Sequence, residues 1–200
     1  MTTKKNRVPR AEAQEIILNA ADELFYREGV HAVSVDAIVE QAGLNKMSVY
    51  RQFSSKTDLV LAYLERKQAA FRDEWETSMA KHPGEPRQQL LQFFRDLAAK
   101  ASAEKFRGCC FLNVAVEFPD KNHPARQLVC AHQKELYEKF AEIVTALGAA
   151  NPCELAYTLI LLMEGTYADS QTYGTDSTAI TLLPAIVEKL IDSASATSQP

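Results

Sequence analysis

One short segment, residues 45–52, combines amide, cationic, hydroxyl and aromatic side chains. The candidates to face outward there are Asn45, Lys46, Met47, Ser48, Tyr50, Arg51 and Gln52. Val49 and Phe53 lie about one helical turn apart, so they can anchor a short helix in a core. Ammonium, guanidinium and phenol groups bind DNA phosphates, and such side chains also reach base edges in the major groove. The segment predicts a DNA-reading helix; the alternative is a surface helix with no partner.

The residues before this segment predict a second short helix joined to it by a sharp turn. Val35, Ile38 and Ala42 recur at helical spacing, and Ser34 precedes them as a candidate N-cap. Gly43 follows, and glycine adopts backbone angles that other residues avoid. Two short helices meeting at one glycine form a helix-turn-helix pattern.

Longer helices flank this pattern. An apolar stripe predicts an opening helix from about Pro9 to Arg27, ending at Gly29. A further helix is expected to begin after a cap at Ser54 or Ser55 and to continue to about residue 81. Lys56 lies at its start, where the free amides of a helix N-terminus also favour phosphate.

Composition limits the protein class. The chain has 200 residues, 46% hydrophobic, with only seven glycines and eight prolines. With its long helical periods, this predicts an all-α protein with one small and one larger domain. No apolar run is long enough to span a membrane, and the four cysteines show neither metal-ligand nor disulfide spacing. We therefore expect a cytoplasmic protein without metal or cofactor.

The charge distribution is compatible with a nucleic-acid partner. The net charge is −4, but residues 1–56 hold eight Lys and Arg against seven Asp and Glu. Lys4, Lys5, Arg7 and Arg10 cluster in the leading arm. A local cationic surface on an acidic protein is sufficient for phosphate contacts.

The remainder of the chain predicts a helical bundle. A loop is expected at residues 82–86, and the apolar segment 109–118 is expected to be buried. Pro124 suits the first turn of a long helix that stops at Gly148, and residues 151–152 begin another. The last helix is expected at about residues 178–191, with Pro184 either beginning or kinking it. Residues 194–200 are expected to form a disordered tail.

The run from Ala20 to Leu59 resembles the DNA-binding domain of TetR-family transcriptional regulators. The matching positions are Phe25, Gly29, Val35, Ile38, Ala42, Gly43, Leu44, Tyr50, Phe53, Lys56 and Leu59. The resemblance implies an all-α protein of about nine helices, with a helix-turn-helix domain at residues 1–55 and a ligand-binding and dimerisation domain at 56–193. It also implies a homodimer formed through the last two long helices, with reading heads roughly 34 Å apart on a near-palindromic operator.

The same resemblance implies roles for individual residues. Tyr50 and Lys56 would hold phosphates, assisted by Ser34, while Lys46, Met47, Ser48 and Arg51 would approach base edges or the backbone. Tyr50 could instead serve packing. A small-molecule effector would release the protein from its operator, as in a repressor; activation is left open.

Candidate effector contacts follow from an apolar pocket with a few polar groups. The candidate walls are Phe71, Trp75, Phe94, Phe111, Phe140, Met163 and Tyr167, and the candidate polar contacts are Asn113, Glu117, His132 and Glu164. For each aromatic residue, core packing is the alternative. For Glu117 the alternative is an ion pair within the bundle, because a carboxylate in an apolar segment needs a partner.

Three other functions are alternatives to this one. Cys109 and Cys110 could sense oxidants or electrophiles if a thiol has a depressed pKa; buried inert thiols are the alternative. A helical scaffold would not need the exposed face around Tyr50. An enzyme is disfavoured because the chain has no phosphate loop, nucleophile elbow or zinc motif.

Overall fold

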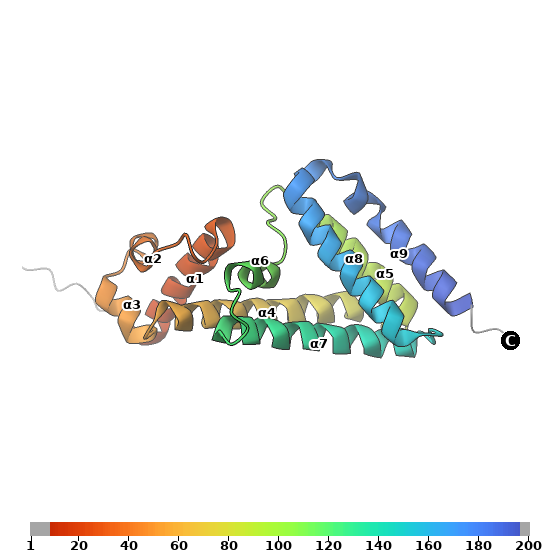
Figure 1. The fold of residues 1–200 in the computed structure, drawn as a ribbon, viewed down its shortest axis with the longest axis horizontal. Helices are drawn as coiled ribbons and strands as arrows, with labels where there is room; N and C mark the ends of the chain where they lie inside the picture. The colour runs from red at the N-terminus through yellow and green to blue at the C-terminus, as the bar shows by residue number, and fades with distance from the viewer. Residues whose placement is uncertain (1–8, 197–200) are drawn as a thin grey trace, which may run out of the picture. The chain divides into compact units, whose positions relative to one another are not determined.

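The computed structural model describes residues 9–196, within which it contains only helices and loops (Figure 1). The helices are α1 (Arg10–Glu28), α2 (Val35–Ala42), α3 (Lys46–Gln52), α4 (Lys56–Ala80), α5 (Pro86–Ala101), α6 (Cys110–Glu117), α7 (Pro124–Ala146), α8 (Pro152–Tyr173), the 3-10 turn η1 (Gly174–Asp176) and α9 (Thr178–Ala196). The expectation of an all-α chain with about nine helices is confirmed over this range. No helix within residues 9–196 has both the length and the apolar character needed to cross a bilayer.

The described residues form two compact units. The first contains the chain up to Lys67 together with Asn113–Leu128, and the second contains Gln68–Leu112 together with the residues from Val129 onward. This division differs from the expected boundary at residue 56, because α4, α6 and α7 each contribute residues to both units.

The core of the first unit joins α1 to the two short helices and to the beginning of α4. Its buried residues include Ile17, Leu24, Phe25, Ile38, Val49, Phe53, Leu59 and Tyr63. The rings of Phe25 and Tyr63 meet edge to face at 5.6 Å. Val35, which shares the helical spacing of Ile38, is only partly buried. An ion pair of 2.5 Å between Lys67 and Asp22 also joins α4 to α1.

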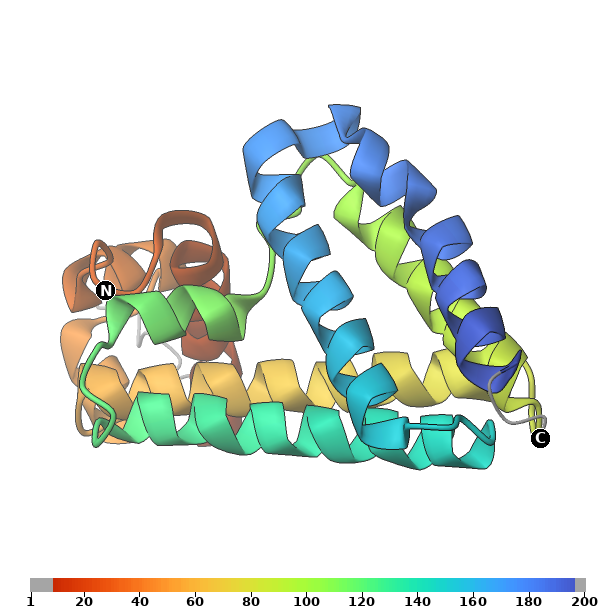
Figure 2. The ribbon, with the colours of Figure 1, turned by 45° about the vertical axis from the view of Figure 1, so that its right-hand side comes forward.

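The second unit is organised around aromatic residues. Trp75 lies 4.9 Å from Phe93 and 5.1 Å from Phe140, measured between ring centroids. Phe93 in turn meets Phe94 edge to face at 5.4 Å. Figure 2 shows α5, α8 and α9 lying side by side, and all three contribute buried side chains to this core. Truncating one such aromatic residue to alanine is expected to destabilise the fold by about 3–5 kcal/mol.

Several helix ends agree with the sequence expectations. The hydroxyl of Ser55 accepts the N–H of Asp58 at 3.0 Å, so Ser55 caps α4. Pro124 begins α7, and Asn151 caps α8 through the N–H of Glu154. Pro184 lies inside α9 and does not begin it.

Two expectations differ from the structure. The segment 109–118 is not buried throughout, since Val116 is 84% exposed. The segment forms helix α6, so Phe111 and Val114, three residues apart, are buried while Val116 points away from them. The expected tail from residue 194 is helical to Ala196, and its remaining residues, 197–200, lie outside the described residues.

Candidate functional site

The turn between α2 and α3 is defined by local hydrogen bonds. The hydroxyl of Ser34 accepts the N–H of Ala37 at 3.1 Å, as an N-cap does. Gly43 ends α2 in the left-handed region, with φ of 63°, which a side chain would disfavour. Its N–H donates to the carbonyl of Glu40 at 3.1 Å. These local contacts direct the chain from α2 into α3.

Helix α3 presents one face to the core and another to solvent. The side chain of Asn45 caps it, with Oδ1 accepting the backbone N–H of Ser48 at 2.9 Å and its hydroxyl at 3.1 Å. Val49 is 2% exposed. Met47 and Tyr50 are 62% and 46% exposed, although large apolar and aromatic side chains are usually covered. A short helix held in this way displays its polar face in a fixed orientation.

Two lysines flank this face. The ammonium group of Lys46 lies 2.7 Å from Asp36 Oδ1, and this hydrogen bond raises the pKa of Lys46. Lys56 is the first residue of α4 and is partly buried. Burial lowers the pKa of Lys56, and the negative charge of Glu117 opposes that change. Both cations therefore have an acidic neighbour with which a DNA phosphate would compete.

The loop between α1 and α2 is held by Glu117 at the end of α6. The Glu117 carboxylate accepts the N–H of Val30 at 2.9 Å and that of His31 at 2.5 Å. His31 Nδ1 also lies 3.3 Å from Glu117 Oε2. A Cβ on Gly29 would lie 3.1 Å from Glu117 Oε1, so a glycine at that position permits the close approach.

The beginning of α1 is braced against the end of α3. Gln52 Nε2 donates to the carbonyl of Arg10 at 3.1 Å, and Arg10 Nε donates to Gln52 Oε1 at 3.4 Å. Arg10 is thus the described member of the basic arm, while Lys4, Lys5 and Arg7 lie outside the described residues.

All eight residues predicted to bind DNA belong to the first unit. Ser34 precedes α2, Lys56 begins α4, and the other six lie on α3 or at its cap. Sequence reasoning anticipated the cap at Ser34 but missed the one at Asn45. It also missed the brace at Gln52 and the pairing of Lys46 with Asp36, since each joins residues on different helices.

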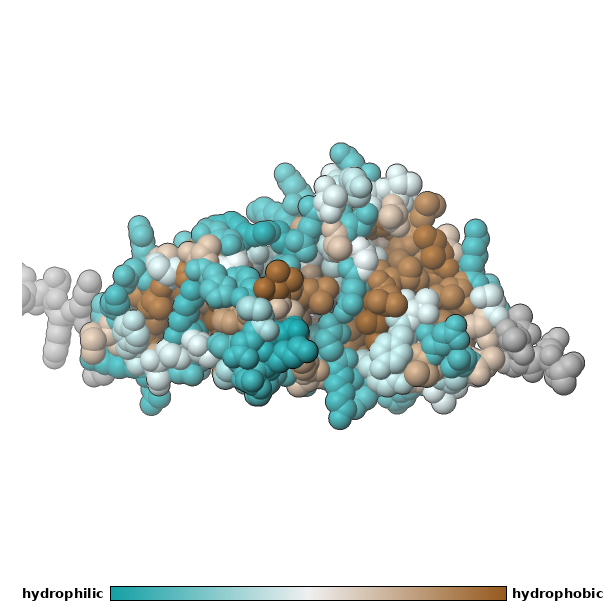
Figure 3. Space-filling view, in the orientation of Figure 1, coloured by the Kyte–Doolittle hydropathy of each residue, from teal (hydrophilic) through white to brown (hydrophobic). Residues whose placement is uncertain are grey.

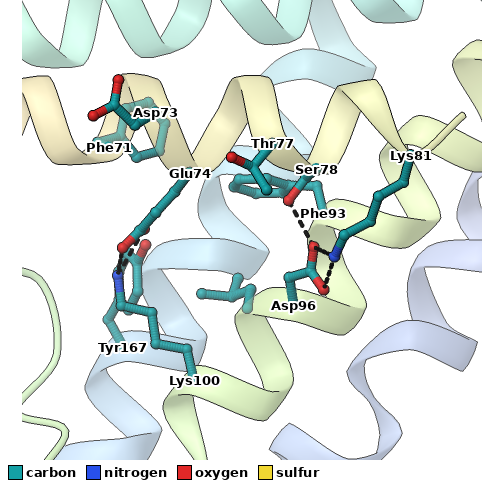
Figure 4. Close-up of a pocket in the computed structure, with 11 residues that line it drawn as sticks. Phe71, Asp73, Glu74, Thr77, Ser78, Lys81, Phe93, Asp96, Lys100 and Tyr167 are labelled. Atoms are coloured by element: carbon teal, nitrogen blue, oxygen red, sulfur yellow. Dashed lines mark hydrogen bonds and ion pairs between the residues drawn. The ribbon is translucent and has the colours of Figure 1, made fainter. Parts of the chain in front are cut away.

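The second unit contains a groove of about 410 Å³ between α4 and α5, with one side chain contributed by α8 (Figure 4). It is lined by Phe71, Asp73, Glu74, Thr77, Ser78, Lys81, Phe93, Asp96, Leu97, Lys100 and Tyr167. Asp96 accepts hydrogen bonds from Ser78 at 2.7 Å and from Lys81 at 2.8 Å. Burial raises the pKa of Asp96, but the hydrogen bonds from Lys81, Ser78 and Gln92 outweigh it, and the net shift is downward.

The predicted effector contacts are dispersed. Phe71 and Tyr167 line the groove. The side chains of Trp75, Phe94 and Met163 are buried in the aromatic core. For Trp75 and Phe94 this is the core packing that was the alternative to effector contact. Asn113 and Glu117 belong to the first unit, where Glu117 binds the α1–α2 loop and lies beside the His31 ring. The charged groove residues were missed because exposed charges on a helix give no distinguishing sequence signal.

His132 and Phe111 stack within the second unit. Their ring centroids lie 3.6 Å apart, and Phe71 meets His132 edge to face at 5.3 Å. His132 is 4% exposed, and its Nδ1 has no hydrogen-bond partner among the described residues. Burial lowers the pKa of His132 to about 4. The imidazole is therefore neutral at pH 7, and a buried polar atom is left unsatisfied.

The adjacent cysteines are partly buried and not disulfide-bonded. A hydrogen bond with Cys110 lowers the pKa of the Cys109 thiol, burial raises it, and the backbone amides of Leu112 and Phe111 lower it further. The net shift is downward. Within residues 9–196, no three His, Cys, Asp or Glu side chains are arranged to hold a metal ion.

An apolar face lies on α8 and α9. Leu161 is 66% exposed, Tyr157 53%, Leu182 51% and Ile186 43%. Figure 3 shows hydrophobic residues gathered over these two helices. Contiguous apolar patches of this kind mark sites of association with another surface.

Comparison with protein families identifies the chain. Residues 17–63 match the model of bacterial regulatory proteins of the tetR family. Residues 84–186, more than half of the chain, match the tetracyclin repressor-like C-terminal domain. The chain belongs to the TetR family. The helix-turn-helix is therefore that of a transcriptional regulator, and the expectation that the protein is not an enzyme is confirmed.

Similar proteins support this assignment at two levels. The HTH-type transcriptional activator FasR of Mycolicibacterium smegmatis is 46% identical over 61 residues, which cover 30% of this chain and 28% of FasR. A crystal structure of a TetR-family regulator from Streptomyces coelicolor is 28% identical, with a TM-score of 0.88 over 92% of this chain and 97% of that one. A TetR regulator from Chloroflexus aurantiacus is 25% identical, with a TM-score of 0.81 over 92% and 96%. Local identity is thus highest over a short region, whereas the fold is shared over nearly the full length.

Proposed function

We propose that this TetR-family protein is a cytoplasmic homodimeric repressor that leaves a near-palindromic operator when a small molecule binds its C-terminal part. The exposed face of α3, fixed by the Asn45 cap, carries the proposal. A rigid polar helix face suits the major groove, where phosphate contacts position the protein and base-edge contacts specify the sequence.

Individual side chains would divide this work. Tyr50 and Lys56 would bind phosphates, and Ser34 would lie close to the backbone at the N-terminus of α2. Lys46 and Arg51 would reach phosphates or base edges, with Asn45 and Ser48 beside them. The exposed Met47 would pack against a thymine methyl group.

Dimerisation would use the apolar face of α8 and α9. A two-fold axis brings the same patch of both subunits together, so an exposed apolar helix pair can cover itself. The effector would act by binding the released conformation more tightly than the DNA-bound one, since only differential affinity shifts such an equilibrium.

Fluorescence anisotropy with DNA flanking the gene tests operator binding. We expect sequence-selective binding whose affinity falls by about a thousandfold between 50 and 200 mM salt if six phosphates are contacted. Tyr50→Ala should weaken binding at least roughly tenfold while the protein remains dimeric. Tyr50→Phe removes the hydroxyl but keeps the ring, so comparing its affinity with that of Tyr50→Ala shows which of the two groups contributes to binding. A dimer without salt-sensitive, selective binding to any candidate operator would refute the regulator described here.

The direction of regulation needs a separate measurement. A promoter fusion should be silenced by the wild-type protein and released by the Tyr50→Ala variant. Activation by the wild type, the role in the name of FasR, would replace repression in the proposal.

A thiol sensor is the second candidate function, favoured by the lowered pKa of Cys109. An α,β-unsaturated carbonyl would be attacked by the thiolate at its β-carbon, forming a C–S bond while the α-carbon takes a proton from water. Mass spectrometry after brief treatment with N-ethylmaleimide should find Cys109 modified before Cys130, although Cys130 is the more exposed thiol. Earlier modification of Cys130 would rule out an activated Cys109.

A further inference from the structure

Helix α2 contributes a carboxylate to the polar face of α3. Asp36 is the second residue of α2, and Lys46 is the first residue of α3, the helix that contacts it (Figure 1). The ammonium nitrogen of Lys46 lies 2.7 Å from Asp36 Oδ1, and the two side chains are 53% and 70% exposed, respectively. The pair therefore places a hydrogen-bond donor and an acceptor side by side on the surface, where both are open to a further partner.

The contact between Lys46 and Asp36 leaves hydrogen-bonding capacity on both groups. An ammonium group has three donors, and this contact uses one of them. A carboxylate has two oxygens with about four acceptor sites, so Asp36 can accept from another donor as well. Lys46 can therefore donate to other acceptors while the ion pair stays intact.

A DNA phosphate is a poor partner for this lysine. The phosphate would have to compete with the Asp36 carboxylate for Lys46, and it would then lie close to a like charge. In a helix-turn-helix, the N-terminal residues of the second helix contact base edges, and Lys46 is the first residue of α3. A base edge, which is uncharged, is therefore the better partner for the pair.

The spacing of the pair matches the edge of one base pair. In a G·C pair, cytosine N4 donates to guanine O6, so an acceptor and a donor lie about 2.9 Å apart in the major groove. Lys46 donates and Asp36 accepts across a similar distance, 2.7 Å. Guanine N7 offers the ammonium a second acceptor, whereas at an A·T pair it would meet a single acceptor, thymine O4, beside a methyl group. The pair therefore favours G·C over A·T.

We propose that Asp36 is a specificity-determining residue that reads one G·C base pair in each half-site of the operator together with Lys46. Lys46 donates to guanine O6 and N7, and Asp36 accepts from cytosine N4. The proposal rests on the proposed function in taking α3 as the reading helix. It gives Asp36 a role beyond that of an acid that stabilises the N-terminus of α2.

The test measures discrimination between base pairs. In vitro selection from a randomised duplex library identifies the sequence that the full-length wild-type protein binds, and anisotropy then gives the affinity for each base pair at each half-site position. Asp36→Ala and Lys46→Ala should both lose discrimination at the same G·C position, by about tenfold. Because partial unfolding lowers the affinity for all duplexes alike, it cancels from this ratio.

Glu40→Ala is the matched control, because Glu40 is an exposed acid one turn further along α2. This change removes the same charge and should leave discrimination at every position unchanged. If Asp36→Ala changes the affinity for all duplexes by one common factor, Asp36 acts only through its charge and the proposal is wrong. The proposal is also wrong if Asp36→Ala and Lys46→Ala relax different positions, or if their shared position is not G·C.

Failure of the proposed function gives a different result. If the wild-type protein selects no sequence, the regulator function fails, and the role of Asp36 fails with it. If the wild-type protein selects an operator and Tyr50→Ala weakens its binding, while Asp36→Ala leaves every base preference intact, the regulator stands and the role of Asp36 alone is refuted.

Discussion

The two units of this protein differ in which groups they expose and which they bury. In the first unit, the polar side chains of α3 are exposed and oriented by caps such as Asn45. In the second, an imidazole with an unsatisfied nitrogen is buried at His132, while leucine and isoleucine side chains on α8 and α9 face solvent.

This difference suits the two units to different tasks, the first to binding a partner and the second to changing when a molecule binds. A rigid polar surface suits a charged partner that is bound reversibly and controlled by salt. An unsatisfied core group, an apolar face and a groove are features that binding of another molecule could complete. We therefore infer that the first unit is built to keep one shape and the second to change with its partners.

The largest expected effect concerns the apolar face. Leu161→Glu would place a carboxylate in the proposed dimer interface once from each subunit, and burying an unpaired charge is strongly unfavourable. We expect the dimer dissociation constant to rise at least roughly a hundredfold. Sedimentation equilibrium measures this constant, and Ala70→Glu, which introduces the same carboxylate at an exposed position of α4, is the control. An unchanged dimer would show that this face lies outside the interface.

The second prediction concerns His132 and pH. Burial lowers its pKa to about 4, from 6.5, so the unfolded chain binds a proton below pH 6.5 while the native state remains neutral. The contribution of His132 to the free energy of unfolding is therefore complete above pH 6.5 and is lost as the pH falls toward 4. The loss is about 2 kcal/mol at pH 5 and about 3 kcal/mol in all.

His132→Phe removes this titration. Urea unfolding at pH 7.5 and pH 5 should show the variant gaining stability relative to wild type as pH falls. The carboxylate of Asp96, whose pKa is lowered, titrates in both proteins and cancels in the difference. A constant difference between the two pH values would mean that His132 is protonated in the native state.

The contrast between the units also explains what the sequence could predict. The α2–α3 pattern was predicted because its signals are local: a serine cap, helical spacing and one glycine with positive φ. Contacts between segments far apart in the chain were not accessible. Glu117 binds amides 86 and 87 residues away, and nothing in its apolar surroundings indicates which backbone it would reach.

The groove was predicted poorly for a related reason. Apolar periodicity identifies which side chains are buried, but a core residue such as Phe94 and a groove residue such as Phe71 give the same pattern. The acidic lining residues resemble any solvated helix face. Their arrangement depends on the pairing of α4 with α5, which the sequence does not specify.

The third prediction tests how rigidly the first unit is held. In Glu117→Gln, one acceptor oxygen becomes an NH₂ group, so the two loop amides compete for a single oxygen. Leaving one of them unsatisfied should lower the free energy of unfolding by about 1–3 kcal/mol. Thermal unfolding measures the effect, and Glu104→Gln, an exposed acid in the second unit, is the control. Equal unfolding temperatures for the two variants would show that the Glu117 contacts contribute no net stability.

The smallest effect gives the most direct comparison of the two units. Asn45 and Asn151 are both N-caps, accepting backbone N–H groups at 2.9 and 3.3 Å respectively. Replacing either with alanine should destabilise its helix by about 1 kcal/mol. However, α3 has seven residues and α8 has 22, so α3 depends far more on its cap. Hydrogen exchange should show α3 losing protection in Asn45→Ala, whereas α8 stays protected in Asn151→Ala. Operator affinity should fall in the first variant alone, because recognition requires that the polar face of α3 remain ordered. If both variants bind the operator like wild type, the cap does not fix the reading surface.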